Sequence, residues 1–211
     1  MSMSTFVYRK DNEDRRPSDR RLNRLRSYAV FMKEIIVNPR AIGAACPSSP
    51  YLAKAMAAMV DGRDSEGLVV ELGGGTGAIT HALLQQGVAP GRLVTIERSP
   101  ALAAHLREKF PEIRVIEGDA ARMQELLGAD SERVRAVVSG LPLRSLPAPT
   151  VQRIIQQVRA LLRTDGTFVQ FTYDLRAPSI GQVQSHSHID TKIVWKNIPP
   201  ARVDAYSGPT M

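Results

Sequence analysis

This sequence of 211 residues lacks several features that would define its class at once. It contains a single cysteine, Cys46, so an internal disulfide is excluded and a reducing compartment is expected. No run of about 18 uninterrupted apolar residues occurs, which predicts that nothing spans a membrane. The first residues lack the apolar centre of a signal peptide, because charges begin at Arg9. We therefore expect a cytoplasmic protein.

Aromatic residues are also scarce, at 5% of the chain. Proteins that hold single-stranded nucleic acid stack its bases on aromatic side chains, so this composition does not favour such a partner. The length suits one medium-sized domain with a sizeable core. An NAD enzyme normally adds a separate substrate domain, for which a sheet of six or seven strands leaves little room.

Positive charge is unevenly distributed. Residues 1–40 carry a net charge of +5, whereas residues 41–211 carry only +2 of the total of +7. This asymmetry indicates an anionic partner for the amino-terminal part, such as a membrane surface or nucleic acid.

The basic region contains a helical pattern that ends at Asn38-Pro39. Its apolar positions lie three or four residues apart, and its arginines fall mostly beside that stripe. The helix either packs on the domain or lies on anionic lipid, where each basic side chain adds roughly 1 kcal/mol. We divide the chain into this arm, residues 1–45, and a domain of residues 46–211. The residues predicted to bind the membrane are Arg20, Arg21, Leu22, Arg24, Leu25 and Arg26.

After the arm, short apolar runs alternate with helical patterns. Strands are predicted near 68–72, 93–97, 113–116, 135–139 and 166–173, and helices near 50–60, 76–86, 99–109 and 148–163. Two further strands, within 192–196 and 201–206, are joined by only four residues and must be antiparallel. We therefore expect an α/β fold, a Rossmann-like, seven-stranded, mostly parallel sheet with an antiparallel carboxyl-terminal strand and amino-terminal helices.

The run Leu-Val-Val-Glu-Leu-Gly-Gly-Gly-Thr-Gly at 68–77 is the most informative segment. A buried strand leads into a glycine turn, where the missing Cβ atoms let a ligand approach the backbone, and a helix amino terminus follows. The glycines alone fit NAD as well as S-adenosylmethionine.

Acids after three successive strands separate these cofactors. Glu71 can accept a hydrogen bond from the cofactor's amino-acid part or hold the loop. Glu97 suits ribose hydroxyls, and Asp119 suits an adenine amino group. This order resembles the class I S-adenosylmethionine-dependent methyltransferases. The cofactor-binding residues that we predict are Ser48, Ser49, Glu71, Gly73, Gly75, Thr76, Gly77, Glu97, Arg98, Asp119, Ala120 and Ser139.

The segment Ser-Gly-Leu-Pro-Leu after the fourth strand lies where such a sheet exposes its methyl acceptor. Adenine methyltransferases carry Asn/Asp-Pro-Pro-Tyr or a relative of it there, whose aromatic ring stacks on the base. Ser139 and Leu143 replace the polar and aromatic residues, so stacking is unsupported. We predict that Gly140, Leu141 and Pro142 contact the acceptor.

Four blocks in order, residues 31–49, 70–77, 137–143 and 196–201, resemble the soluble bacterial phospholipid N-methyltransferases. The resemblance implies methylation of phosphatidylethanolamine and its mono- and dimethyl derivatives toward phosphatidylcholine, on the inner face of the cytoplasmic membrane. Gly74 stands where that family usually has proline, which implies a looser turn.

Transfer of the sulfonium's methyl group to an amine requires that the nitrogen is neutral and approaches the methyl carbon in line with its bond to sulfur. Tyr173, His186 and His188 are the candidate catalytic residues, because they follow the fifth strand, and Arg176 is a candidate for the lipid phosphate. His186, His188 and Asp190 have a weak metal-binding spacing, and we assign no metal.

We expect S-adenosylmethionine as cofactor, S-adenosylhomocysteine as product, an anionic membrane as partner and a monomer. Two alternatives stay open, an RNA adenine N6-methyltransferase and a lipid-surface protein that binds the cofactor without turnover.

Overall fold

The computed structural model describes residues 48–60, 66–163, 165–179 and 186–209, without the side chains of His186 and Pro209. The predicted amino-terminal arm and its six proposed membrane-binding residues lie outside the described residues. Among the helices within this described part, none is both long and apolar enough to cross a membrane.

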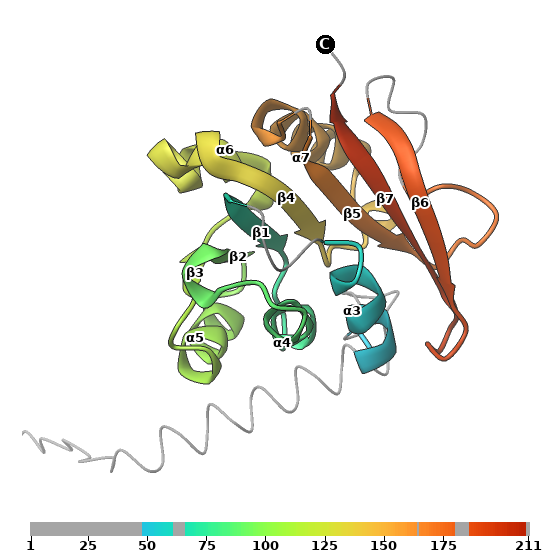
Figure 1. Cartoon of the computed structure of the whole chain (residues 1–211), viewed down its shortest axis with the longest axis horizontal. Coiled ribbons are helices and arrows are strands. Elements are labelled where there is room, and N and C mark those ends of the chain that lie inside the picture. The colour runs from blue at the N-terminus through green and yellow to red at the C-terminus, as the bar shows by residue number, and fades with distance from the viewer. Residues whose placement is uncertain (1–47, 61–65, 164, 180–185, 210–211) are drawn as a thin grey trace, which may run out of the picture.

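Seven strands form one sheet in the order β3-β2-β1-β4-β5-β7-β6 (Figure 1). The first five strands are parallel, and β7 is antiparallel to both of its neighbours, β5 and β6. The predicted fold is therefore confirmed. The strands are β1 (Leu68–Leu72), β2 (Leu93–Glu97), β3 (Arg114–Glu117), β4 (Val134–Ser139), β5 (Thr167–Thr172), β6 (His186–Val194) and β7 (Ala201–Pro209).

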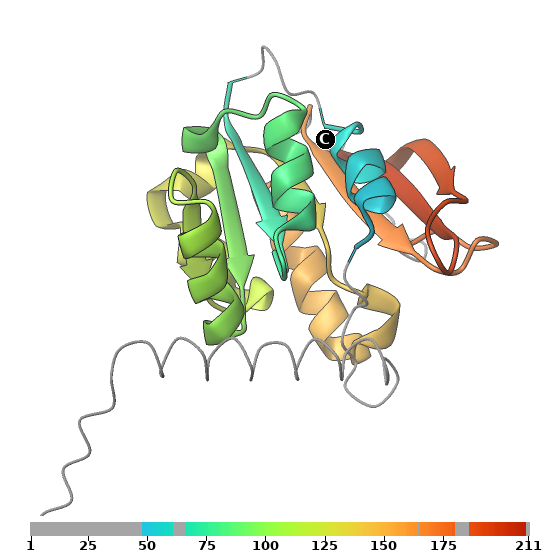
Figure 2. The same cartoon turned by 90° about the horizontal axis from the view of Figure 1, so that it is seen from below.

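Helices cover both faces of the sheet, with α3, α4 and α5 on one side and α6 and α7 on the other (Figures 1 and 2). Serine hydroxyls begin two of them, because Ser49 and Ser99 each accept a hydrogen bond from a backbone N–H three residues ahead. The helices are α3 (Pro50–Ala57), α4 (Ala78–Gln85), α5 (Pro100–Lys109), α6 (Met123–Leu127) and α7 (Ala148–Leu161), with short 3-10 turns at Pro90–Arg92, Ala120–Arg122, Gly128–Arg133 and Leu143–Ser145.

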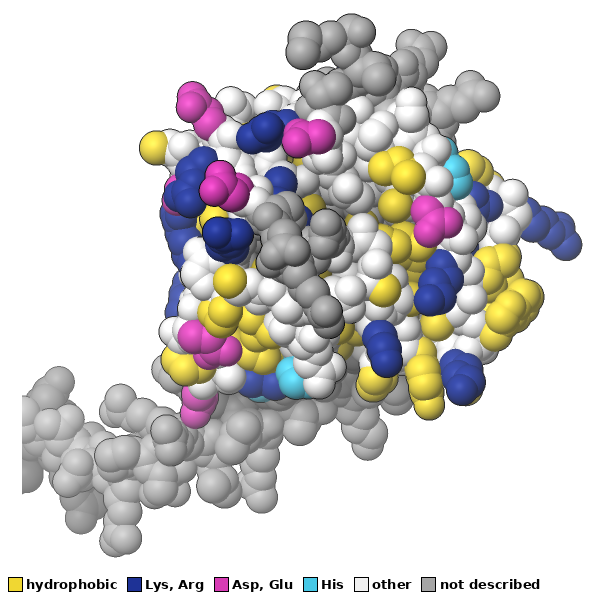
Figure 3. Space-filling model, viewed as in Figure 1, with side chains coloured by type: hydrophobic (Ala, Val, Ile, Leu, Met, Phe, Trp, Pro, Cys, Tyr) yellow, Lys and Arg dark blue, Asp and Glu magenta, His cyan; other side chains and the backbone are white. Residues whose placement is uncertain are grey.

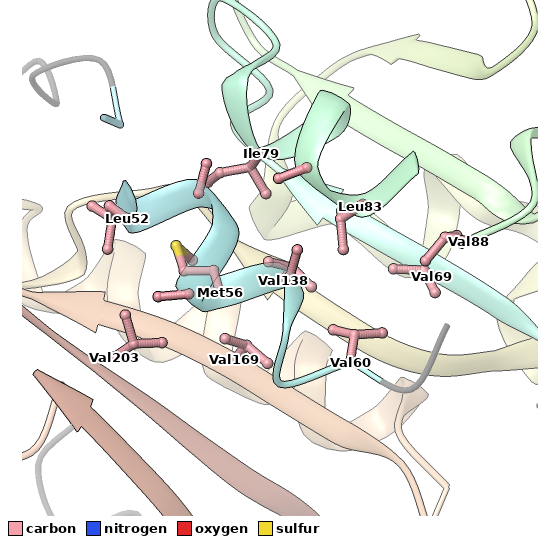
Figure 4. Packing of buried hydrophobic residues seen from close by; sticks show 14 of the residues in the cluster. Leu52, Met56, Val60, Val69, Ile79, Leu83, Val88, Val138, Val169 and Val203 are labelled. Carbon is pink, nitrogen blue, oxygen red and sulfur yellow. The ribbon is translucent and has the colours of Figure 1, made fainter. Parts of the chain in front are cut away.

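The core consists of two apolar layers, one on each side of the sheet. Leu52 and Met56 of α3 are fully buried, and they lie between α4 and the sheet, near Val169 of β5 and Val203 of β7 (Figure 4). Burying a side chain of this size contributes about 1.5–3 kcal/mol. This packing fixes α3 beside the last strands, although it precedes the first strand in the sequence.

A buried carboxylate joins the last strands to the loop that leaves β5. Asp204 of β7 has no exposed surface, and it accepts hydrogen bonds from the Ser179 backbone N–H, the Arg202 Nε and the Thr191 hydroxyl, each at 2.7 Å. Burial alone would raise the pKa of Asp204, but these hydrogen bonds lower it below its ordinary value. The carboxylate therefore connects three separate segments of the chain.

We predict that Asp204→Ala lowers the free energy of unfolding by roughly 3–5 kcal/mol, because it leaves buried donors without an acceptor. A carboxyl group with a lowered pKa stabilises the fold above its unfolded-state pKa, and this contribution is lost as the pH falls through the folded-state value. Urea unfolding of the wild type and the variant at neutral and acidic pH measures both effects.

The control is Asp165→Ala, because the Asp165 side chain is 76% exposed in a surface ion pair with Arg163. Its effect on the free energy of unfolding should stay within about 0.5 kcal/mol. Equal effects of the two substitutions would contradict the role of Asp204.

Candidate active site

The turns that follow β1 and β4 meet at the carboxyl edge of the sheet. Leu72 pairs with Ser139, the last residue of β4. Beyond that pair, the Gly140 N–H donates to the Leu72 carbonyl at 2.8 Å, and the Gly73 N–H donates to the carbonyl of Ile96 on β2, also at 2.8 Å. The predicted cofactor turn, residues 73–77, and the predicted acceptor turn, residues 139–143, are therefore neighbours.

Glycine is required in the first turn for two reasons. Gly73 and Gly75 have φ angles of +74° and +55°, which residues with a side chain rarely adopt. A Cβ atom on Gly73 would also lie 2.6 Å from Cδ2 of Leu141. The glycine turn consequently carries no side-chain atoms on the side where Leu141 of the acceptor turn packs against it.

The space beside the Cα atom of Gly74 is filled by neighbouring side chains. A Cβ atom there would lie 2.4 Å from the Thr95 methyl carbon and 2.7 Å from a Leu106 methyl carbon. The turn is also closed by a 2.8 Å hydrogen bond from the Gly77 N–H to the Gly74 carbonyl. Neighbouring side chains thus fill the space beside Gly74, and the looser turn expected from the missing proline stays a prediction.

Glu97 connects the glycine turn to the end of β2. Its Oε2 accepts from the Gly75 N–H at 2.9 Å, and its Oε1 accepts from the Ser99 N–H at 2.8 Å. The side chain is nearly buried at this edge. Each carboxylate oxygen has two lone pairs, so Glu97 keeps acceptor capacity for the hydroxyls of a ribose.

Glu71 lies beneath the turn. It is completely buried, and its Oε2 accepts from the hydroxyls of Thr80 at 2.6 Å and Thr95 at 2.8 Å, whereas its Oε1 has no hydrogen-bond partner among the described residues. Burial raises the pKa of Glu71 from 4.5 to about 7, although the two threonines lower it. These contacts join β1 to β2 and α4, on either side of the glycine turn, and both roles considered for Glu71 stay predictions.

The third acid begins a short helical turn after β3. Asp119 is half-buried, and its Oδ1 accepts from the Ala121 N–H at 2.9 Å. The preceding Gly118 N–H donates to the Glu97 carbonyl at 3.0 Å, which places the ends of β2 and β3 side by side. Ala120 is buried, and Arg98, next to Glu97, is exposed.

The acceptor turn forms an apolar wall with a polar residue behind it. Leu141 and Pro142 are half-exposed, whereas Ser139 and Gly140 are buried. The Leu141 carbonyl accepts from Nε2 of the buried Gln170 at 2.8 Å, and Oε1 of Gln170 has no partner within the described part of the chain. Sequence reasoning missed Gln170; the only signal was a polar residue within the apolar strand β5.

Of the proposed catalytic residues, Tyr173 is at this edge. It follows β5, is half-buried, and packs edge-on against Phe171 with ring centroids 5.4 Å apart. His188, in contrast, pairs with Tyr206, which itself lies opposite Phe168 near the start of β5. Its Nε2 lies 2.7 Å from the Thr191 hydroxyl.

The expected placement of His186 and His188 after the carboxyl end of β5 is therefore wrong. β6 runs in the same direction as β5 because both are antiparallel to β7, so the chain returns to the opposite edge before β6 begins. The backbone of His186 pairs with Pro209, which is farther still from the site.

Four more predicted residues remain, three at the periphery and Thr76 within the glycine turn. The exposed Arg176 is in the loop after β5, where its N–H donates to Asp174 at 3.0 Å. Ser49 uses its hydroxyl to begin α3 and to donate to Asn197, and Ser48 precedes it half-buried. Thr76 is half-buried in the glycine turn, and its carbonyl accepts from Lys109 Nζ at 2.9 Å.

Comparisons with known proteins agree with this geometry. Residues 69–166 match the model of a methyltransferase domain. Ornithine lipid N-methyltransferase of Singulisphaera acidiphila is 32% identical over 70% of this chain and 79% of its own length. The chain belongs to the class I S-adenosylmethionine-dependent methyltransferases.

More distant relatives share this fold. Ribosomal RNA small subunit methyltransferase A of Chlorobium chlorochromatii is 29% identical to this methyltransferase over 48% of the chain, which spans only 37% of that relative. A Burkholderia thailandensis 1,6-didemethyltoxoflavin-N1-methyltransferase, solved with S-adenosylhomocysteine, superimposes with a TM-score of 0.60 at 16% identity, over 95% of this chain and 93% of that one.

The residues at the carboxyl edge fit S-adenosylmethionine, which supplies an electrophilic methyl group on its sulfonium sulfur. The backbone at Gly75 has open space beside it for a ligand, Glu97 offers an acceptor for ribose hydroxyls, and Asp119 offers one for an adenine amino group. The buried carboxyl group of Glu71 lies beneath the turn, where its pKa of about 7 leaves it only partly ionised at neutral pH.

We predict that Glu97→Ala weakens binding of S-adenosylhomocysteine on the order of 10- to 100-fold. A hydrogen bond to a charged acceptor is worth roughly 1.5–3 kcal/mol, and the variant also loses the bond to Gly75. Calorimetric titration measures the dissociation constant. Glu117→Ala is the matched control, because Glu117 ends the neighbouring strand β3 with its side chain 45% exposed. An unchanged dissociation constant for folded Glu97→Ala would refute this role.

We predict that Glu71→Gln changes how stability depends on pH. Because the folded-state pKa of about 7 lies above the ordinary value of 4.5, the folded protein retains this proton between those values, and stability falls as the pH rises through that range. Relative to Glu71→Gln, the wild type should lose about 3 kcal/mol of unfolding free energy between pH 4 and pH 8. Urea unfolding without cofactor tests this, and a difference that is constant with pH would contradict it.

Proposed function

We propose that this methyltransferase transfers methyl groups to the primary amine of a membrane-lipid head group. The substrate proposed is phosphatidylethanolamine, followed by its mono- and dimethyl derivatives toward phosphatidylcholine. The observation that carries the proposal is the match to an ornithine lipid N-methyltransferase, which extends over most of both chains. Ornithine lipid and phosphatidylethanolamine both present an amine at the surface of a bilayer.

The acceptor turn suits an alkyl amine better than a base. Leu143, which stands at the position where adenine methyltransferases carry an aromatic residue, is only 3% exposed and packs in the core layer beneath α7. It therefore has no face on which a base could stack. The exposed part of the turn, Leu141 and Pro142, offers aliphatic surface instead.

An apolar wall also favours the reactive form of the substrate. A primary alkyl amine resembles lysine, with a pKa of about 10.4, and is mostly protonated at neutral pH. Desolvation beside Leu141 and Pro142 would lower that pKa and favour the neutral nitrogen. Tyr173, at the end of β5, is the proposed hydrogen-bonding group that orients the amine, so positioning supplies much of the rate.

The second candidate is methylation of adenine in RNA. It is favoured by several ribosomal RNA small subunit methyltransferase A relatives, including the Chlorobium chlorochromatii protein and one of Chlorobaculum parvum that is 30% identical over 61% of this chain. The chain spans less than half the length of each of these two relatives. The aliphatic acceptor turn argues against this candidate.

The deciding experiment incubates the full-length protein with methyl-labelled S-adenosylmethionine and one of three acceptors. These are vesicles containing phosphatidylethanolamine, vesicles containing ornithine lipid, and small-subunit ribosomal RNA. We expect label in the lipid extract of the first reaction, as mono-, di- and trimethylated head groups. Label confined to ornithine lipid would change the substrate, and label in RNA nucleosides would establish the second candidate. No transfer despite S-adenosylhomocysteine binding would indicate a binding protein without turnover.

A further inference from the structure

The hairpin between β6 and β7 exposes large apolar side chains at its tip. Trp195 is 69% exposed and Ile198 is 90% exposed. Tyr51, at the start of the adjacent helix α3, is 53% exposed. Single exposed apolar residues are common, but here three large ones lie on two elements that pack together, since α3 contacts β6 and β7.

The tip lies at the same edge of the sheet as the cofactor turn. Thr172, the last residue of β5, pairs with Arg202, and Val194 pairs with Ala201, so residues 195–200 extend beyond the carboxyl end of β5. Figure 1 shows this hairpin beside α3. A flat surface that touches the tip therefore faces the edge where the acceptor turn lies.

The tip of the hairpin is fixed to the domain by polar contacts of Asn197. Asn197 is buried, its Oδ1 accepts from the Ser49 hydroxyl, and its Nδ2 donates to the Pro199 carbonyl at 2.6 Å. Its backbone N–H also donates to the Val194 carbonyl at 3.2 Å. These bonds hold the backbone on both sides of Ile198. Binding through the exposed apolar side chains therefore does not have to overcome the conformational entropy of a disordered loop.

Positive charge surrounds the apolar tip. Lys54, one helical turn after Tyr51, and Lys192 and Lys196 of the hairpin are all exposed. Lys196 Nζ lies 5.5 Å from the centre of the Tyr51 ring. Residues 48–60 and 191–203 contain no aspartate or glutamate. Figure 3 shows basic and hydrophobic side chains side by side over α3 and the hairpin.

Tryptophan, tyrosine and lysine next to aliphatic side chains are the combination that enters the head-group region of a bilayer. We propose that this surface docks the enzyme on anionic membranes and so presents its substrate edge to lipid head groups. It consists of Tyr51, Lys54, Lys192, Trp195, Lys196 and Ile198, and is called the hairpin surface below. This inference rests on the proposed lipid substrate, and it assigns docking to the folded domain in addition to the proposed amino-terminal arm.

Trp195 is the only tryptophan in the chain, so its fluorescence reports on the hairpin surface directly. The full-length protein should show emission at long wavelength and strong acrylamide quenching in buffer. Vesicles containing phosphatidylglycerol should shift the emission to shorter wavelength, reduce acrylamide quenching, and allow quenching by lipids brominated on their acyl chains. Salt should weaken the response, because the three lysines are exposed.

Ile198→Glu is the variant that tests the surface, and Ile189→Glu is its matched control. Ile189 is 57% exposed on β6, toward the end of that strand away from the tip. Ile198→Glu should weaken vesicle binding on the order of tenfold or more, because it places a charge where apolar burial is required. Ile189→Glu should leave vesicle binding within about twofold, and both variants should bind S-adenosylhomocysteine like the wild type.

Three results would overturn the inference. Trp195 emission that does not change while the protein cosediments with vesicles would place the docking surface elsewhere. Protection of Trp195 from acrylamide before vesicles are added would mean that another part of the chain, or a second copy, covers the surface. Equal loss of binding for Ile198→Glu and Ile189→Glu would indicate a non-specific charge effect.

Failure of the proposed function can be recognised separately. Penetration of Trp195 into vesicles without methylation of any lipid would support the docking surface and refute the lipid substrate. Conversely, if Ile198→Glu methylates bilayer phosphatidylethanolamine as fast as the wild type, the substrate stands and the docking role fails. A short-chain phosphatidylethanolamine dissolved as monomers should be methylated equally by both proteins, since no surface must be reached.

Discussion

The close approach of two turns, one after β1 and one after β4, is the constraint on which the site depends. The parallel register brings Leu72 beside Ser139, and the next residues are then forced together, with the Gly140 N–H on the Leu72 carbonyl. Glycine is favoured at position 73 because its φ of +74° is rare for residues with a side chain, and a Cβ there would also displace a methyl group of Leu141. The turns predicted to bind the cofactor and the methyl acceptor are adjacent for this reason, although about 65 residues separate them in the sequence.

Local sequence signals predicted the elements that build this edge. The glycine run after an apolar strand and the acids at Glu71, Glu97 and Asp119 are recognised from residues that lie within a few positions of a strand end. The seven-stranded sheet with antiparallel carboxyl-terminal strands followed from the alternation of strands and helices and from the short connection between the last two runs.

Features that depend on tertiary placement were not predicted. The sequence does not reveal that β7 lies between β5 and β6, so His188 was expected at the wrong edge. The direction in which polar side chains within buried strands point could also not be predicted from the sequence. Glu71 and Gln170 occur in buried strands, and their partners, Thr80, Thr95 and the Leu141 carbonyl, come from other elements. Sequence reasoning assigned membrane contact to the amino-terminal arm, and the exposed hairpin emerged only from the folded arrangement.

The packing around Gly74 limits which sequences can form this turn. Thr95 has two tasks, because its methyl group fills the space beside Gly74 while its hydroxyl holds the carboxylate of Glu71. A homologue with a side chain at position 74 would therefore need the methyl group at position 95 to be displaced or absent. Serine at position 95 would remove the methyl group and keep a hydroxyl for the acid at position 71, so positions 74 and 95 should be exchanged together when the turn of one family member is transplanted into another.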